Sequence, residues 1–302
     1  MSIIVGVDAG GTRTTAVVAE GDRWLARAEG PAGAVRPGRA MAAAGTIATV
    51  VRSALVQTGR VRADVLTVGA SGVGRDDERQ ALRAALRMEA LADRLLITTD
   101  IEIALVAAFG DGPGIVLLSG TGSFAVARAA DGTQRRQGGY GWRMGDEGSA
   151  YALGEAALRA AGQAEDGRSR ATALTEALCR QTRSATFNDL VRWSVVATPT
   201  EVAGLSTSVL AAAEAGDDVA LQLVTNAAGS LTRLVAGLLR EYPADARVPV
   251  ALAGGLLAQP SWRAAVRQAL ERIPGAVPVE TPVEPVRGAL RLGQAAVEAA
   301  SA

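Results

Sequence analysis

The stretch IIVGVDAGGTRTTAVVAE, residues 3–20, consists of two apolar runs joined by a short segment that holds Asp8, two glycines and Thr12. A glycine pair between runs of β-forming residues is typical of a hairpin turn. Glycine also tolerates positive φ and close approach by a ligand, so the N–H groups of such a turn can converge on phosphate oxygens. Taken alone, the stretch favours a plain hairpin.

The phosphate-binding interpretation gains support from a second copy of the pattern. The apolar run GIVLL is followed by SGTGS, residues 119–123, and then by another apolar run. The repeated order of strand, Gly/Thr turn and strand predicts two related α/β domains that face each other across a cleft and grip a triphosphate. A third glycine pair, Gly254-Gly255 in LAGGL, suits close approach to a base or ribose, or a simple corner of the chain.

The order of apolar and amphipathic runs predicts an α/β fold throughout. Strands are expected at residues 3–8, 14–20, 24–28, 65–71, 95–100, 114–120, 124–130 and 248–256. Helices are expected at about 38–57 and 77–88, within 148–242, and at the C-terminal end. We expect a first domain at residues 1–105 and a second at 106–302, with the helix of about 286–302 packing back on the first.

The composition excludes several classes of chemistry. The chain has 302 residues, with 31 basic against 31 acidic residues and no histidine. Histidine-dependent hydrolases, His-ligated zinc sites and His general bases are therefore excluded. Carboxylates, basic side chains, hydroxyls, backbone donors and hard cations such as Mg²⁺ remain, and phosphoryl transfer needs little more.

The composition also predicts the kinds of binding partner and the cellular compartment of the protein. Balanced charge argues against binding to nucleic acid, and the lack of a long apolar run argues against a membrane span. The chain goes directly into a strand pattern without a signal-peptide pattern, so we expect it in the cytoplasm. The single cysteine, Cys179, excludes an internal disulfide.

Two aspartates at strand ends are candidates for chemistry. Asp8 ends the first strand and would sit where a hydrated Mg²⁺ on the phosphates could be held, or else is a solvated aspartate in a hairpin. Asp100 ends the strand LLITTD and is well placed to be a general base. Because Asp100 directly precedes a helical run, it is also a good helix N-cap, and both roles can hold at once.

The segment GGYGWRMGDEG, residues 138–148, is unusually rich in glycine just before a helix. Such a loop serves backbone geometry, because glycine there costs chain entropy. Asp146 and Glu147 can accept hydrogen bonds from sugar hydroxyls, with Asp146 the preferred ligand. The alternative is that these acids stabilise the N-terminal end of the following helix.

In this order, DAGGTRTT, LITTD, LLSGTGS, GGYGWRMGDEGSAY and LAGGL resemble the N-acetylglucosamine kinase family. That family belongs to the actin-like ATPase and sugar kinase superfamily, in the BadF/BadG/BcrA/BcrD-type ATPase group that also holds the 2-hydroxyacyl-CoA dehydratase activators. The resemblance covers essentially the whole chain. It implies two ribonuclease-H-like domains, ATP with Mg²⁺, a homodimer, and phosphoryl transfer to the 6-hydroxyl of an amino sugar.

The resemblance also implies roles for individual residues. Asp100 matches the family's general base, and Asp8 would hold the metal. The residues implied to contact the nucleotide are Gly10, Gly11, Thr12, Arg13, Gly120, Thr121, Gly122, Ser123, Gly254 and Gly255. The residues implied to contact the sugar are Thr121, Gly139, Tyr140, Gly141, Asp146 and Glu147.

The sequence departs from the family where the sugar should bind. Ala34 stands where family members that bind N-acetylglucosamine carry a sugar-contacting asparagine, and Phe124 stands where the animal enzymes have asparagine. The kinase residues are therefore present while the identity of the sugar is left open. The other interpretation of the resemblance is an ATPase that activates a partner protein, but such activators use two cysteines per chain to hold an iron–sulfur cluster, and this chain has one.

Overall fold

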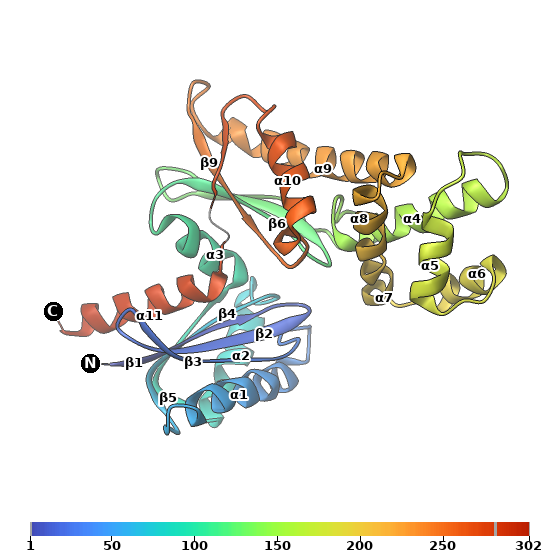
Figure 1. Cartoon of the computed structure of the whole chain (residues 1–302). Coiled ribbons are helices and arrows are strands. Elements are labelled where there is room, and N and C mark those ends of the chain that lie inside the picture. The colour runs from blue at the N-terminus through green and yellow to red at the C-terminus, as the bar shows by residue number, and fades with distance from the viewer. Residues whose placement is uncertain (1, 281–282, 302) are drawn as a thin grey trace. The chain divides into compact units, whose positions relative to one another are not determined.

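The computed structural model describes residues 2–280 and 283–301, so Met1, Thr281, Pro282 and Ala302 of the predicted domains lie outside the described residues. The chain divides into two compact units (Figure 1). Unit 1 runs from the N-terminus to Gly112 and takes up the C-terminal segment from Val283, and unit 2 lies between them from Pro113. The C-terminal helix thus belongs to the unit that begins the chain.

Unit 1 is built on a five-stranded sheet with the order β3-β2-β1-β4-β5. Its strands are β1 (Ile3–Ala9), β2 (Arg13–Glu20), β3 (Arg23–Pro31), β4 (Ala63–Ala70) and β5 (Ala92–Thr99). The first three strands pair antiparallel, whereas β4 and β5 run parallel to β1 and to each other. The carboxyl ends of β1, β4 and β5 therefore meet at one edge of the sheet, which is where functional residues gather in α/β folds.

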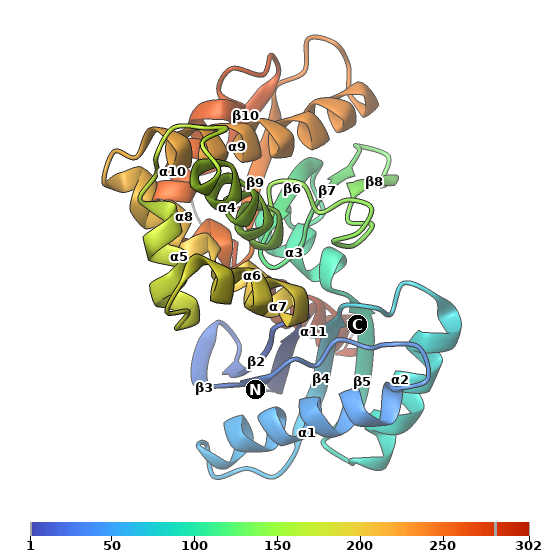
Figure 2. The same cartoon turned by 90° about the vertical axis from the view of Figure 1, so that its right-hand side faces the viewer.

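Helices cover both faces of this sheet, as Figures 1 and 2 show. On one face lie α1 (Ala40–Val56) and α2 (Asp76–Met88), and on the other lie α3 (Asp100–Phe109) and α11 (Pro285–Ser301). The alternation of side chains along a strand explains the division. In β1, Val5 and Val7 join the core under α1, while a Cβ at Gly6 would touch Leu290 of α11.

Unit 2 repeats the same sheet. Its order is β8-β7-β6-β9-β10, with two antiparallel pairings followed by two parallel ones. The strands are β6 (Gly114–Ser119), β7 (Ser123–Arg128), β8 (Gln134–Gly138), β9 (Val248–Ala253) and β10 (Ala276–Pro278). The prediction of an α/β chain built from two related domains is confirmed, since both sheets share one strand order.

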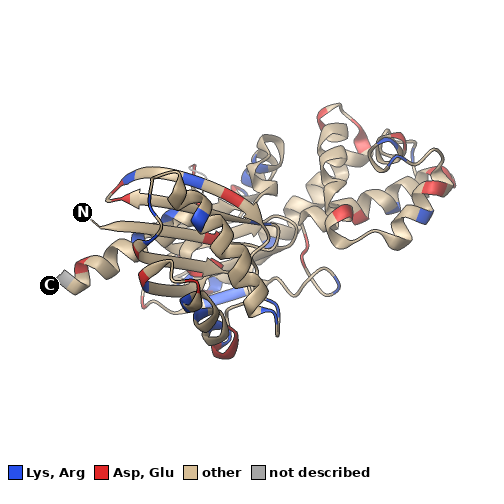
Figure 3. Cartoon of the chain, turned by 90° about the horizontal axis from the view of Figure 1, so that it is seen from below, with Lys and Arg blue, Asp and Glu red and all other residues tan. Residues whose placement is uncertain are grey.

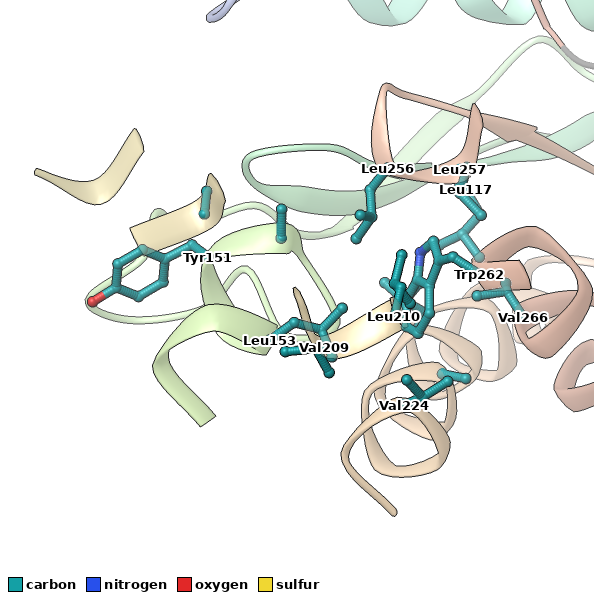
Figure 4. Close-up of a cluster of buried hydrophobic side chains, with 14 of the residues drawn as sticks. Leu117, Tyr151, Leu153, Val209, Leu210, Val224, Leu256, Leu257, Trp262 and Val266 are labelled. Carbon is teal, nitrogen blue, oxygen red and sulfur yellow. The ribbon is translucent and has the colours of Figure 1, made fainter. Parts of the chain in front are cut away.

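The helices of unit 2 are mostly inserted between β8 and β9. They are α4 (Ala150–Glu165), α5 (Leu174–Thr182), α6 (Phe187–Val196), α7 (Pro199–Gly204), α8 (Ser206–Glu214), α9 (Asp218–Leu238) and the 3-10 helix η1 (Leu239–Glu241), followed after β9 by the 3-10 helix η2 (Leu256–Ala258) and α10 (Pro260–Leu270). Helix α9 packs against β7 and β8, and α10 packs on α9. Figure 4 shows Trp262 of α10 deep in this core, near Leu117 and Val266.

The surface agrees with the balanced composition. Figure 3 shows acidic and basic residues interspersed along the helices. Pairs such as Arg159–Glu155 and Arg180–Glu176 lie one helical turn apart on exposed faces. None of the helices in the described part of the chain is both long and apolar enough to cross a membrane.

Candidate active site

The β1–β2 turn is the predicted hairpin, and its backbone closes on itself. The Gly10 N–H donates to the Arg13 carbonyl at 3.0 Å, so this donor shapes the turn. The Gly10 carbonyl accepts a hydrogen bond from the Ala34 N–H at 3.2 Å. The turn therefore lies beside Ala34, at the edge of the sheet where β1 ends.

Asp100 is the first residue of α3 and follows the last residue of β5 directly. The side chain of Thr99 caps the helix, because its hydroxyl accepts a hydrogen bond from the Glu102 N–H at 3.0 Å. The Asp100 carboxylate accepts a hydrogen bond from the Ile101 N–H at 3.0 Å. The expectation that Asp100 is the N-cap is wrong: the cap is Thr99, one residue earlier.

Asp8 and Asp100 are electrostatically coupled. The pKa of Asp8 is raised to about 7, chiefly by burial and also by the negative charge of Asp100, while the charge of Arg13 acts in the opposite direction. A like charge disfavours the ionised form of a carboxyl group only when it is near, so the effect on Asp8 indicates that the Asp100 carboxylate lies near it. The end of β1 and the start of α3 therefore bring these two acids to one place in unit 1.

This pair suits a hard divalent cation. Mg²⁺ prefers oxygen ligands, keeps several waters and is bound through one or two carboxylates plus substrate phosphates. Among the described residues no group of three or more His, Cys, Asp or Glu side chains is placed to hold a metal. A partly buried carboxylate beside a second one fits a magnesium ion that a nucleotide brings with it.

The second glycine turn, between β6 and β7, is fastened to the start of α4. The Gly120 N–H donates to the Gly122 carbonyl at 2.9 Å, and the Gly120 carbonyl accepts the Ala150 N–H at 2.8 Å. The buried Ser119 hydroxyl donates to the Gly148 carbonyl at 2.8 Å, and the Ser123 hydroxyl donates to the Glu147 carbonyl at 2.7 Å. Hydrogen bonds thus hold the SGTGS turn (residues 119–123) and the GDEGS segment (residues 145–149) together.

Asp146 faces this turn. Its Oδ1 accepts the Ser123 N–H at 3.3 Å, and a Cβ at Gly122 would come within 2.8 Å of its Oδ2. Burial raises the pKa of Asp146, and the N–H of Ser123 partly offsets that effect. Asp146 also holds a φ of 62°, which is uncommon for a residue other than glycine and is kept only where the surroundings require it.

Glu147 does not share the position of Asp146. It is exposed, and only its backbone carbonyl takes part in the contacts of the turn. The alternative role of these acids as helix caps is also wrong, because the Ser149 hydroxyl caps α4 by accepting the Ala152 N–H at 3.1 Å. The structure therefore separates the two adjacent acids, with Asp146 turned to the glycine loop.

The glycine-rich segment before Asp146 is held by an arginine that the sequence did not single out. Arg136 donates to the carbonyls of Gly138 and Gly139 at 3.2 and 2.9 Å, and its guanidinium lies 4.5 Å from the ring centroid of Phe124. Gly139 and Gly141 have φ of 73° and 87°, so the backbone turns sharply on both sides of Tyr140. The Tyr140 side chain is 71% exposed and is therefore open to a ligand.

The third glycine pair abuts the second glycine turn. Gly254 has a φ of 105°, and a Cβ there would lie 2.5 Å from the Ser119 carbonyl oxygen. Leu256 and Leu257, directly after the pair, are buried and anchor the loop in the core of unit 2 (Figure 4). Only glycine at position 254 allows β9 and β6 to end so close together.

Two groups of predicted site residues therefore emerge. Unit 1 brings together Asp8, Gly10–Arg13 and Asp100, and unit 2 brings together 119–123, Asp146 and Gly254–Gly255. Thr99 and Ser149 were not predicted as N-caps. Each lies directly before the first residue of a helix, and Thr and Ser are favoured at that position. The sequence does not identify Arg136 as a site residue. Its partners are backbone carbonyls, which every residue carries, so no pattern of residue types marks the contact.

Comparison with known proteins agrees with this arrangement. A model of the BadF/BadG/BcrA/BcrD ATPase family matches residues 5–293. The N-acetylmuramic acid/N-acetylglucosamine kinase of Clostridium acetobutylicum is 28% identical over 195 residues, which is 64% of this chain and 64% of that protein. The N-acetyl-D-glucosamine kinase of Dictyostelium discoideum is 26% identical over 310 residues, covering 96% of this chain and 97% of that protein.

A solved structure from Chromobacterium violaceum, provisionally named an N-acetylglucosamine kinase, has a TM-score of 0.80 to this chain. The two are 31% identical, and the match covers 97% of this chain and 99% of the other. The family model, the Dictyostelium sequence and the Chromobacterium structure each match nearly the whole length of the chain. The chain belongs to the BadF/BadG/BcrA/BcrD ATPase family.

Proposed function

We propose that this protein is an ATP-dependent kinase that transfers the γ-phosphoryl group to the 6-hydroxyl of an amino sugar, N-acetylglucosamine or a relative such as glucosamine. The observation that carries the proposal is the placement of Asp100 at the first position of α3, next to Asp8. The names of the relatives support the substrate class.

Asp100 is the general base. It takes the proton from the attacking hydroxyl, so that the oxygen can bond to the γ-phosphorus as the bond to the β-phosphate oxygen breaks. The cap provided by Thr99 fixes the backbone at the start of α3, and a defined backbone restricts where the carboxylate can lie.

The glycine turns bind the nucleotide. Gly10–Arg13 in unit 1 and Gly120–Ser123 in unit 2 contact the phosphates, and Gly254–Gly255 contacts the adenosine. Positioning and charge stabilisation supply most of the catalysis of phosphoryl transfer. Mg²⁺ would be held by Asp8 and would neutralise charge on the phosphates.

In unit 2, residues around Asp146 contact the sugar. Asp146 accepts hydrogen bonds from hydroxyls, supported by its fixed position against Ser123 and its partly buried carboxylate. Thr121 and the segment Gly139–Gly141 complete the contacts, and the exposed Glu147 accepts a hydrogen bond from a further hydroxyl. A homodimer in the cytoplasm completes the proposal, with an expected mass of twice the 30.7 kDa of one chain by light scattering.

The deciding experiment is a coupled ADP-release assay. The purified protein is given Mg·ATP with glucosamine, N-acetylglucosamine, N-acetylmuramic acid, N-acetylmannosamine or glucose. Stimulation of ADP release by an amino sugar, with the 6-phosphate identified by mass spectrometry, is the expected result. ATP hydrolysis that no sugar accelerates would instead favour an ATPase that acts on a partner protein.

Asp100→Asn tests the role of the base. Loss of a positioned general base costs about 10²–10⁴ in rate, so turnover should collapse while ATP binding is kept. Asp93→Asn is the matched control, because Asp93 lies near the opposite end of β5, is exposed and pairs with Arg62 at 2.7 Å. Near-normal turnover in Asp100→Asn would contradict the assignment.

A further inference from the structure

Helix α3 rests on the sheet through one side chain that fills the space over a glycine. A Cβ built at Gly69 of β4 would overlap Ile103 of α3, with Cγ1 and Cγ2 of Ile103 only 2.6 and 2.7 Å away. Ile103 itself is fully buried. The bare backbone of Gly69 therefore lets α3 lie closer to β4 than any other residue would allow.

Gly69 is at the level of Asp8 in the sheet. The two residues are register partners on the parallel strands β1 and β4. Partners on adjacent strands point to the same face, so the position of the missing side chain at Gly69 lies beside the Asp8 carboxylate. A change in the distance between α3 and β4 at Gly69 therefore occurs directly beside the Asp8 carboxylate.

Ile103 and Asp100 share one face of α3. They are three residues apart, the spacing that places side chains on adjacent turns of one helical face. The face of α3 that rests on Gly69 is consequently the face that carries Asp100 one turn earlier. The influence of Asp100 on the pKa of Asp8 agrees with this proximity.

We propose that Gly69 and Ile103 are positioning residues: the depth at which Ile103 rests over Gly69 sets the place of the Asp100 carboxylate relative to Asp8. The inference rests on the proposed function only in that Asp100 acts there as the general base. The effect of the Gly69–Ile103 contact on the position of Asp100 does not depend on that function. A misplacement of about 1 Å can cost about 10² in rate, so a single added methyl group is enough to matter.

Helix α11 holds α3 from a second direction. The Arg291 guanidinium donates to the carbonyls of Val106 and Ala107 at 3.0 and 3.2 Å. A Cβ at Gly288 would overlap the backbone of Ile103 and Ala107. Because α11 contacts the α3 backbone directly, α3 has little freedom to accommodate a methyl group at position 69 by sliding along the sheet.

The test compares Gly69→Ala with two matched variants. In Gly69→Ala we expect kcat to fall about 10²-fold, with KM for ATP and sugar little changed. The double variant Gly69→Ala/Ile103→Ala removes the overlapping atoms and should recover a large part of kcat. Gly293→Ala is the packing control, because the atoms nearest to a Cβ there belong to Ile4, Thr67 and Val65 of the sheet and not to α3.

Gly293→Ala should lower thermal stability yet keep the kcat of the folded enzyme. Unchanged kcat in folded Gly69→Ala, or equal losses of kcat in Gly69→Ala and Gly293→Ala, would overturn the inference. If Gly69→Ala does not fold, Ile103→Val, which removes one methyl group, should still lower kcat several-fold at constant KM, and an unchanged kcat there would count against it.

A crystal structure separates this inference from the proposed function. Wild type and Gly69→Ala in one crystal form should differ by a shift of Asp100 away from Asp8, and an unmoved Asp100 would overturn the inference. Absence of sugar-dependent turnover in the wild type would contradict the proposed function alone, and the crystallographic comparison would then decide the positioning role.

Discussion

At the scale of single residues, the raised pKa of Asp8 links the stability of the protein to pH. The folded-state pKa of about 7 lies above the ordinary value of 3.8, because burial and Asp100 disfavour the charged form. The stabilising contribution of protonated Asp8 is therefore complete at low pH, and it is lost as the pH rises through about 7.

We predict that Asp8→Asn raises the free energy of unfolding of the ligand-free protein more at pH 8 than at pH 5. The neutral amide avoids the cost of a buried charge, which the wild type bears only when Asp8 is ionised. Urea unfolding of both proteins at the two pH values gives the comparison, and the difference between them cancels the other titrating groups. An equal effect at both pH values would contradict the shifted pKa.

Ala34 offers a prediction for the sugar. Its N–H donates to Gly10, so the residue lies at the edge of unit 1 where β1 ends. We predict that Ala34→Asn lowers KM for N-acetylglucosamine about tenfold, equivalent to about 1.4 kcal/mol, because the amide supplies a hydrogen bond to a hydroxyl. Ala32→Asn, at an exposed position two residues earlier, is the control. No change in KM for any sugar would place the sugar elsewhere.

At the scale of elements, the two glycines that follow β9 should respond differently to substitution. Gly254→Ala forces an unfavourable φ and a contact of 2.5 Å with the Ser119 carbonyl, so we predict a loss of about 1–3 kcal/mol in the free energy of unfolding. Gly255→Ala should change stability little, because its φ is −64° and a Cβ there meets nothing within 4 Å. Equal stabilities of the two variants by urea unfolding would contradict this account of the loop.

The same scale shows which elements could be predicted from sequence. The apolar runs around the two glycine turns predicted β1–β2 and β6–β7, because buried strands and their turns leave local signals. Strand β8 was missed, since its sequence QRRQG has no apolar pattern and forms a strand by pairing with β7. An edge strand of this kind depends on its neighbour rather than on its own residues.

In the candidate site, too, local sequence patterns predicted some features and missed those that depend on tertiary packing. Asp100 was predicted as a site residue at the end of an apolar run, directly before a helix. Its exact position was not predicted, because Asp100 is the first residue of α3 and Thr99 is the cap. The contact between Gly69 and Ile103 joins residues that are far apart in the chain, and no local pattern reports it. Site residues at the ends of strands and helices could thus be predicted from the sequence. The packing contacts that position them could be identified only from the three-dimensional structure.

At the scale of the whole molecule, the two units should differ in their ability to fold alone. The core of unit 2 is drawn from residues between Ile115 and Leu270, a continuous piece of chain. One face of the unit 1 sheet, in contrast, is covered by α11 from the far end of the sequence, as Figure 1 shows. Residues 1–112 alone would expose the surface around Gly6 that α11 covers.

We therefore predict that a fragment of residues 113–282 unfolds cooperatively in urea, whereas a fragment of residues 1–112 does not. Fusion of residues 283–302 to the shorter fragment through a flexible linker should restore a cooperative transition, because it returns the helix that covers the sheet. Circular dichroism follows all three. A cooperative transition in the 1–112 fragment without the added helix would contradict the prediction.

The capture of α11 by unit 1 has a consequence for biosynthesis. Domains near the N-terminus commonly fold first as a chain leaves the ribosome. Here the first strands emerge early but remain without α11 until the residues that follow unit 2 have been synthesised, while unit 2 already has its whole core. Assembly of the two units therefore runs against the direction of translation, and the packing around Asp100 is completed only after unit 2 has been made and α11 has left the ribosome.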